Sequence, residues 1–265
     1  MRSSRVYTAA MVKLTSLVLI ALLSFAAASA FAHPVAQTAE AVLHANREAM
    51  DAFPRQGTLL VQYAAEVHGL KGAGTYTIDL ATGMFVDGLS VDPLSSGGGF
   101  DGTTPWKRDK SGVTITQQGG DRIAVAVNEA YRNANLWWRA DHGGAQVSYI
   151  GREKTGTKEL DHLAVTPKGG SRFDAWFDAG SHLLVRMAEP QMFFNTQELY
   201  DDYRRFGSVM LAGTRQVDFG TGPSNIEKKT VTSVALHPAR APSAYARPTS
   251  PAPGGEFVDR AVTDT

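Results

Sequence analysis

The sequence of 265 residues contains no cysteine, and this one absence removes several classes of function. Without a thiol there is no disulfide, no thiolate metal site, no Cys nucleophile and no lipid-modified N-terminal Cys. The chain also has no excess charge, with 26 basic and 26 acidic residues. Its basic residues form no long run. We therefore expect no nucleic-acid partner, because phosphate binding needs a clustered Lys/Arg surface.

Motifs that would indicate an enzyme are missing as well. The sequence has no G-x-S-x-G nucleophile elbow and no Asp-Thr-Gly or Asp-Ser-Gly, the triplets from which retropepsins build their paired carboxylates. None of the seven histidines has the H-x-H or H-x-x-x-H spacing of a metal site. The residues therefore predict no catalytic residue, no metal ligand and no cofactor.

A long apolar run occurs only near the N-terminus, over residues 14–25. Three basic residues precede this run, and Ala30-Phe31-Ala32 follows it, which is the pattern of a secretory signal peptide over residues 1–32, cleaved near Ala32. The run is shorter than the roughly 20 residues that a transmembrane helix needs, and no later segment is longer. We expect a periplasmic or secreted protein whose mature chain starts near His33 and lacks a transmembrane segment. Removing three basic residues leaves 23 basic against 26 acidic ones, so the mature chain has a charge of about −3.

The periodicity of the mature chain predicts a mainly β domain of the α+β class over residues 33–237. Apolar residues at helical spacing indicate one helix over residues 38–52 and a second over 121–138. Most of the remaining sequence consists of short runs with period two, which predict about nine antiparallel strands. Hairpin turns are expected at Lys168-Gly169-Gly170 and Ala179-Gly180-Ser181. The glycine-dense residues 95–102 are expected to form a mobile loop.

The composition changes after His237. Five prolines follow within residues 238–253, in a stretch with few core-forming side chains. This composition is typical of a semi-extended linker, and only about ten residues come after it. We therefore expect residues 238–265 to form a Pro-rich linker or disordered tail.

Aromatic residues are the remaining signal for a binding site. Large aromatics dominate ordinary cores, so a filled core is the plainer interpretation. The functional interpretation is an apolar cavity between a curved sheet and the inserted helix, with a lipid, acyl chain or lipidated peptide as the ligand. The candidate ligand-binding residues are Trp106, Trp137, Trp138, Phe193 and Phe194.

Several segments, taken in order, resemble the N-terminal region of bacterial exported proteins of the retropepsin-like aspartyl protease family. The segments are HANREAM, DLATGMFVD, GFDGTTPWKRD, VNEAYRNANLWW, LAVTPKGGSRFDAWFDAGSHLLVR and TVTSVALHP, and the similarity spans about residues 40–240. The resemblance implies a periplasmic lipoprotein-carrier (LolA/LolB-like) fold, an open half-barrel in which a strongly curved antiparallel sheet wraps one or two helices. It also implies that the catalytic Asp triplet of the family would lie beyond the Pro-rich linker, where this chain ends. No catalytic residue is carried over.

Three hypotheses follow from these observations. The first is a periplasmic, non-enzymatic binding or accessory domain that holds a hydrophobic ligand. The second is the truncated N-terminal part of a retropepsin-like aspartic protease, which handles substrate. The third is a structural envelope protein with a filled core, and this hypothesis predicts solid packing between sheet and helix.

Overall fold

The computed structural model describes residues 37–51, 53–92, 94–109, 111–190, 195–220, 222 and 225–249. These residues form one antiparallel sheet of 13 strands with two α-helices and three short 3-10 helices. The strand order is β6-β5-β4-β3-β2-β1-β13-β12-β11-β10-β9-β8-β7. Consecutive strands pair from β1 to β6 and from β7 to β13, and β13 also pairs with β1 and thereby joins the two halves of the sheet.

The elements have the following bounds. The helices are α1 (Ala39–Ala49), α2 (Gly120–Asn133), η1 (Leu136–Trp138), η2 (His142–Gly144) and η3 (Pro242–Ala244). The first half of the sheet contains β1 (Thr58–Val67), β2 (Leu70–Asp79), β3 (Phe85–Val91), β4 (Leu94–Phe100), β5 (Pro105–Arg108) and β6 (Thr114–Thr116). The second half contains β7 (Gln146–Thr155), β8 (Lys158–Thr166), β9 (Phe173–Asp178), β10 (Leu184–Pro190), β11 (Asn195–Phe206), β12 (Val209–Asp218) and β13 (Ile226–His237).

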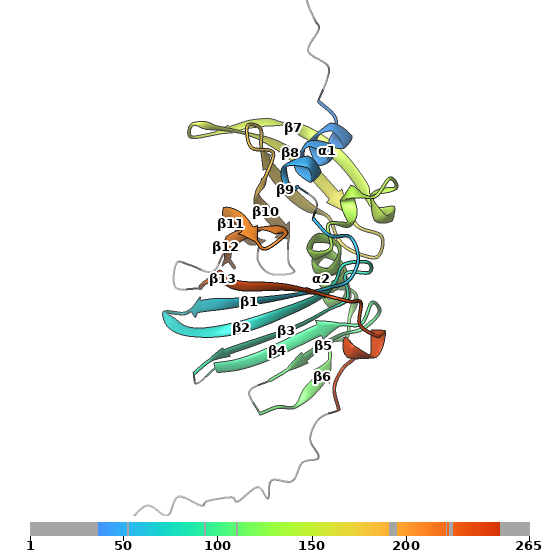
Figure 1. Ribbon diagram of the computed structural model, residues 1–265, viewed down its shortest axis with the longest axis vertical. Coiled ribbons are helices and arrows are strands. Elements are labelled where there is room, and N and C mark those ends of the chain that lie inside the picture. The colour runs from blue at the N-terminus through green and yellow to red at the C-terminus, as the bar shows by residue number, and fades with distance from the viewer. Residues whose placement is uncertain are drawn as a thin grey trace, which may run out of the picture. The chain divides into compact units, whose positions relative to one another are not determined.

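The sheet is strongly curved and does not close into a barrel, since β6 and β7 remain as its two edges. Figure 1 shows β1 to β6 in the lower half, β7 to β10 in the upper half, and α2 between them. The expected α+β class, with an open half-barrel wrapping helices, is confirmed. Nine predicted strand runs become thirteen strands, because one run divides into β2 and β3 and the short strands β4 to β6 were not expected.

Helix α1 covers the half of the sheet that contains β7 to β10. Thr38 caps its N-terminus by accepting a hydrogen bond from the Ala41 amide at 3.1 Å. The buried face of the helix packs into a cluster with strand residues of β8 to β10. This cluster contains Ala39, Val42, Leu43, Leu163, Val165, Phe173, Ala175, Phe177, Leu184 and Met187. The helix ends at Ala49, slightly earlier than its apolar pattern predicts.

Helix α2 packs against β3 and β4 through Ala126 and Ala130, which contact Phe85 and Phe100. The sequence predicts one helix over residues 121–138, but α2 ends at Asn133. Asn135 adopts a left-handed conformation, with φ of 48°, and this stops the helix before the 3-10 turn η1. The break is important because it turns Trp137 and Trp138 in new directions relative to α2.

The prediction of a mobile loop over residues 95–102 is wrong, because most of this segment forms strand β4. Its glycines have a packing role rather than a role in mobility. A Cβ atom at Gly99 would lie 2.7 Å from the Trp106 ring, so only glycine leaves room for the indole on the neighbouring strand.

Gly99→Ala should therefore lower the free energy of unfolding by about 1 to 3 kcal/mol, because the added methyl group overpacks the contact with Trp106. Gly88→Ala on β3 is the matched control, since a Cβ atom there meets only the Thr75 hydroxyl at 3.7 Å. Urea denaturation of both variants measures the difference. Equal stability of the two variants would contradict this role of Gly99.

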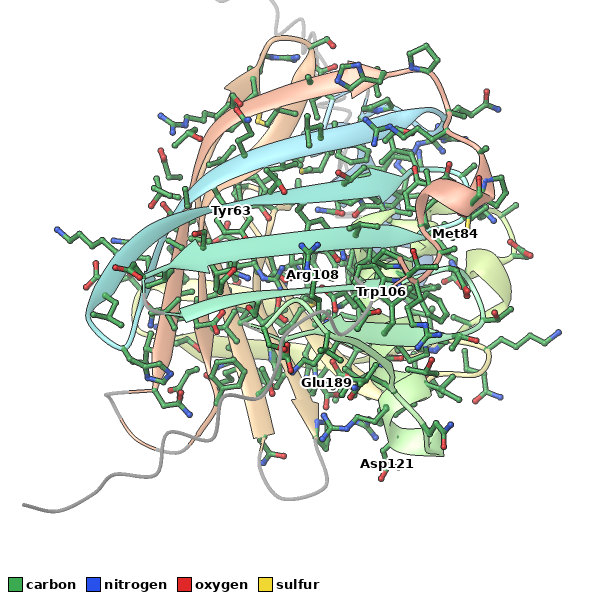
Figure 2. All side chains as sticks on the ribbon, turned by 90° about the horizontal axis from the view of Figure 1, so that it is seen from below. Tyr63, Met84, Trp106, Arg108, Asp121 and Glu189 are labelled. Atoms are coloured by element: carbon green, nitrogen blue, oxygen red, sulfur yellow. The ribbon has the colours of Figure 1, made fainter. Side chains whose placement is uncertain are left out.

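Residues 238–249 make contacts that their Pro-rich composition did not predict. Tyr245 is fully buried, its hydroxyl lies 3.1 Å from the Thr58 Oγ1, and its carbonyl accepts a hydrogen bond from the Trp106 Nε1 at 3.1 Å. Thr114 adds a hydrogen bond to the Pro248 carbonyl. In Figure 2 the labelled Trp106 lies on the same side of the view as this C-terminal segment. The segment thus connects β1, β5 and β6.

Candidate functional site: a cavity between the sheet and helix α2

A cavity of about 180 Å³ lies where the two halves of the sheet face each other. It is lined by β1, β2 and β10 to β13, together with the end of α1, the end of α2 and η1. The separate hydrophobic clusters of the two halves each contribute side chains to its wall, such as Trp137 and Met187 from one cluster and Leu59 and Ile78 from another. The cavity is therefore the space that these clusters leave between them.

Most of the wall is apolar. Strand alternation produces this surface, because residues at every second position of a strand point to the same face of the sheet. The large apolar side chains that line the cavity are Met50, Phe53, Leu59, Val61, Ile78, Trp137, Leu184, Met187, Leu211 and Val231. This apolar wall, as we call it, is a suitable surface for a hydrocarbon chain.

The rest of the wall carries hydrogen-bonding groups. Arg132 and Asn133 come from α2, Tyr200 from β11, Arg215 from β12 and Lys229 from β13. Tyr63, Tyr76, Tyr203 and Asn135 also line the cavity. The charged residues in the lining, as far as the structure describes it, are all cationic. We call Arg132, Arg215 and Lys229 the cationic group.

Two buried carboxylates, neither of which lines the cavity, pair with the arginines. Glu189 accepts a hydrogen bond from the Arg132 Nη1 at 2.6 Å, and Glu198 accepts one from the Arg215 Nη2 at 2.8 Å. Both carboxylates are less than a tenth exposed. Although burial opposes ionisation of Glu198, the adjacent Arg215 and Arg132 lower the pKa of Glu198 to about 2. Burial of the Tyr200 hydroxyl, which donates to Glu198, raises the pKa of Tyr200.

A second polar cluster lies on the β2–β3 side. The Tyr76 hydroxyl donates to Glu129 at 2.7 Å and accepts from the Asn133 side chain at 2.6 Å. Asp87 is directly opposite Tyr76 in the β2–β3 register, so the two side chains share a face of the sheet. Burial, with the nearby charge of Glu129, raises the pKa of Asp87 to about 6.

Asp87→Asn is expected to stabilise the protein at pH 8 and to have little effect near pH 4. Because the folded-state pKa of Asp87 is above its ordinary value of 3.8, its contribution to stability is fully present below pH 3.8 and is lost as the pH rises through about 6. The shift corresponds to about 2 to 3 kcal/mol of unfolding free energy at pH 8. Urea denaturation at both pH values measures it. A variant that is less stable than the native chain at pH 8 would contradict the assignment.

Of the predicted ligand-binding residues that the structure describes, only Trp137 lines this cavity. Trp138 is half-buried, packs edge-on against Phe53 with ring centroids 5.6 Å apart, and donates to the Asn46 side chain. Trp106 is in contact with Tyr245 and the glycines of β4 and is not part of the lining. Phe193 and Phe194 lie outside the described residues, as does the predicted signal peptide.

The sequence reasoning missed the cationic group, although β12 carries a detectable signal. Val209, Leu211, Arg215 and Val217 fall on the same phase of the strand, so a charged residue interrupts an apolar face. A charge on the buried phase of a strand needs a partner, which predicts a carboxylate on the adjacent strand. That partner is Glu198 on β11.

Over the described residues, no group of three or more His, Asp or Glu side chains is arranged to hold a metal ion. Among the helices that the structure describes, none is both long and apolar enough to cross a membrane.

Comparisons with known proteins identify the fold. Neither protein-family models nor curated proteins give a match to this chain. Among solved structures, a LolA superfamily protein from Nitrosomonas europaea matches with a TM-score of 0.54 and 11% identity, over 80% of this chain and 98% of that one. A DUF1329 family protein from Desulfovibrio piger matches with a TM-score of 0.50 and 10% identity, over 78% of this chain and 96% of that one.

The chain therefore has a LolA-like fold, as the resemblance of its sequence segments implied. At such low identity the similarity identifies the fold and nothing more. The relation to retropepsin-like proteases is not shown by these comparisons and stays a prediction.

Proposed function

We propose that this chain is an exported, non-enzymatic binding protein that holds an acyl chain or another hydrophobic ligand in the cavity. The observation that carries the proposal is the apolar wall, which is formed by side chains from both halves of the sheet around a space of about 180 Å³. Burial of hydrocarbon against such a wall is favourable by about 25 cal/mol per Å² of apolar surface removed from water. The LolA-like fold supports the proposal, because an open half-barrel leaves an internal space that a closed, filled core does not.

The periplasm or the exterior of the cell is the proposed location. It rests on the predicted signal peptide of residues 1–32 and on the fold shared with a LolA superfamily protein. A lipid or a lipidated peptide is the proposed ligand class. The third hypothesis, a structural protein with a filled core, predicts solid packing between sheet and helix. The cavity argues against this hypothesis.

Binding of a neutral fluorescent probe, N-phenyl-1-naphthylamine, to the purified chain tests the proposal. We expect saturable binding that is at least tenfold weaker in Ala212→Trp, because Ala212 lines the cavity and the indole would fill it. Leu236→Trp is the control, since Leu236 is 45% exposed and is not part of the lining. Absence of binding, or equal binding by both variants, would overturn the proposal.

The second hypothesis, a substrate-handling part of a retropepsin-like protease, rests on the ordered sequence similarity and on the Pro-rich composition after His237. Its discriminating observation lies in the gene, where an Asp-Thr-Gly or Asp-Ser-Gly triplet encoded downstream would support it.

A further inference from the structure

The cavity has a chemical polarity that a purely hydrophobic ligand would not use. The apolar wall is accompanied by the cationic group and by tyrosine hydroxyls from three strands, β2, β11 and β1. We propose that the ligand is an amphiphile with an anionic head, a carboxylate or a phosphate, which the cationic group binds while the acyl chain lies against the apolar wall. This inference rests on the proposed function and adds the class of head group.

Arg215 has hydrogen-bond donors that the described residues do not use. A guanidinium has five N–H donors in a planar fork that matches the oxygens of a carboxylate or phosphate. The structure gives Arg215 one hydrogen bond to Glu198, and its buried Nε has no hydrogen-bond partner among the described residues. The Arg215 side chain is 26% exposed although it belongs to the cavity wall, so part of its surface faces the space where a ligand would lie.

Lys229 is the second donor for an anionic head. Its Nζ is 3.6 Å from the Glu227 carboxylate and 5.3 Å from the centre of the Tyr63 ring. The ion pair with Glu227 is longer than a hydrogen bond, and both side chains are 22% exposed. The ammonium group therefore keeps donors for a ligand oxygen.

The carboxylates close to the cationic group do not line the cavity. Glu189 and Glu198 pair with the arginines, and Glu129 accepts a hydrogen bond from the Tyr76 hydroxyl. Asp87 and Glu227 are the other acidic groups near Lys229. Of the described residues that line the cavity, none is acidic. A cationic head would thus meet like charges in direct contact, whereas an anionic head would meet hydrogen-bond donors.

Displacement of the neutral probe by matched 12-carbon amphiphiles tests the inference. The series is dodecanoate, dodecyl phosphate, dodecan-1-ol and dodecylammonium, each kept below its micelle-forming concentration at pH 7.5. We expect dodecanoate or dodecyl phosphate to bind at least tenfold more tightly than dodecan-1-ol, and dodecylammonium to bind more weakly than the alcohol. The order of the two anions shows which head the site prefers.

Lys229→Met and Arg215→Met should each lower the ratio of the affinity for the better anion to the affinity for dodecan-1-ol about tenfold. Lys229→Met is the more informative variant, because it leaves the buried pairs of Arg132 and Arg215 intact. Arg122→Met, at an exposed position of α2, is the control. Raised salt should weaken the anions and not the alcohol.

The outcomes separate this inference from the function on which it rests. If dodecan-1-ol and dodecylammonium bind as tightly as the anions, the anionic-head inference is overturned and the hydrophobic binding function stands. If none of the four displaces the probe, the hydrophobic binding function fails as well. Anion binding that Lys229→Met and Arg122→Met weaken equally would also overturn the inference.

Discussion

Trp137→Ala is expected to lower the free energy of unfolding by about 3 to 5 kcal/mol, the usual cost of truncating a buried aromatic side chain. Trp137 is 2% exposed, and its ring lies within 6.4 Å, between centroids, of the rings of Tyr131, Phe173 and Phe177. It also forms part of the cavity wall, so the same change should enlarge the cavity and weaken probe binding. Urea denaturation, with and without probe, measures both effects.

Trp138→Ala is the matched control for this prediction. Trp138 is the adjacent residue of η1, is half-buried and has a single aromatic partner, Phe53, in the described chain. Its truncation should cost clearly less than that of Trp137. A larger loss of stability for Trp138→Ala would show that the aromatic cluster around Trp137 is not the centre of this half of the core.

Glu198→Gln is expected to cost about 3 to 5 kcal/mol, because it removes the carboxylate that pairs with Arg215 and leaves the buried Arg132 with Glu189 alone. The loss should depend on pH in a defined direction. The folded-state pKa of Glu198 is about 2, below its ordinary value of 4.5, so its stabilising contribution is present above pH 4.5 and is lost as the pH falls toward 2. The native chain should therefore lose its advantage over Glu198→Gln between pH 4.5 and 2.

Asp51→Asn provides the comparison for Glu198→Gln, since Asp51 pairs with Arg205 at the surface, where both side chains are about half exposed. Exposed ion pairs contribute about 0 to 1 kcal/mol. Denaturation curves from pH 2 to 7 for both variants make the test. If the two substitutions cost the same amount at pH 7, the buried pairs do not stabilise this fold as we argue.

The sequence predicted the fold class well, because period-two runs and turn residues are local signals. Both expected hairpin turns, at residues 168–170 and 179–181, connect antiparallel strands in the structure. The sequence-based prediction failed where a tertiary contact or a single backbone conformation decides the structure. The glycines of β4 predicted a loop, but Gly99 packs against Trp106 in a strand. The apolar pattern predicted a longer helix α2, but the left-handed Asn135 ends it.

The candidate site was predictable only in part for the same reason. The aromatic residues suggested either a filled core or a cavity between sheet and helix, and Trp137 was among the candidates for the cavity. The cationic group combines Arg132 of α2 with Arg215 and Lys229 of the consecutive strands β12 and β13, which come much later in the sequence, and only the tertiary fold brings them to one wall. Trp106 was a candidate for the cavity wall, but its indole instead donates to the carbonyl of the buried Tyr245, in a C-terminal segment whose composition resembles a linker.

The dependence of affinity on ligand length, in a series of neutral alkan-1-ols, tests most directly whether the cavity binds hydrocarbon. Each methylene buried in the cavity should add about 0.8 kcal/mol, roughly a fourfold gain in affinity, until the space is full. We expect a steep rise followed by a plateau, and an earlier plateau in Ala212→Trp. A series with no measurable binding, or with a rise that continues without a plateau and is unaffected by Ala212→Trp, would contradict this expectation.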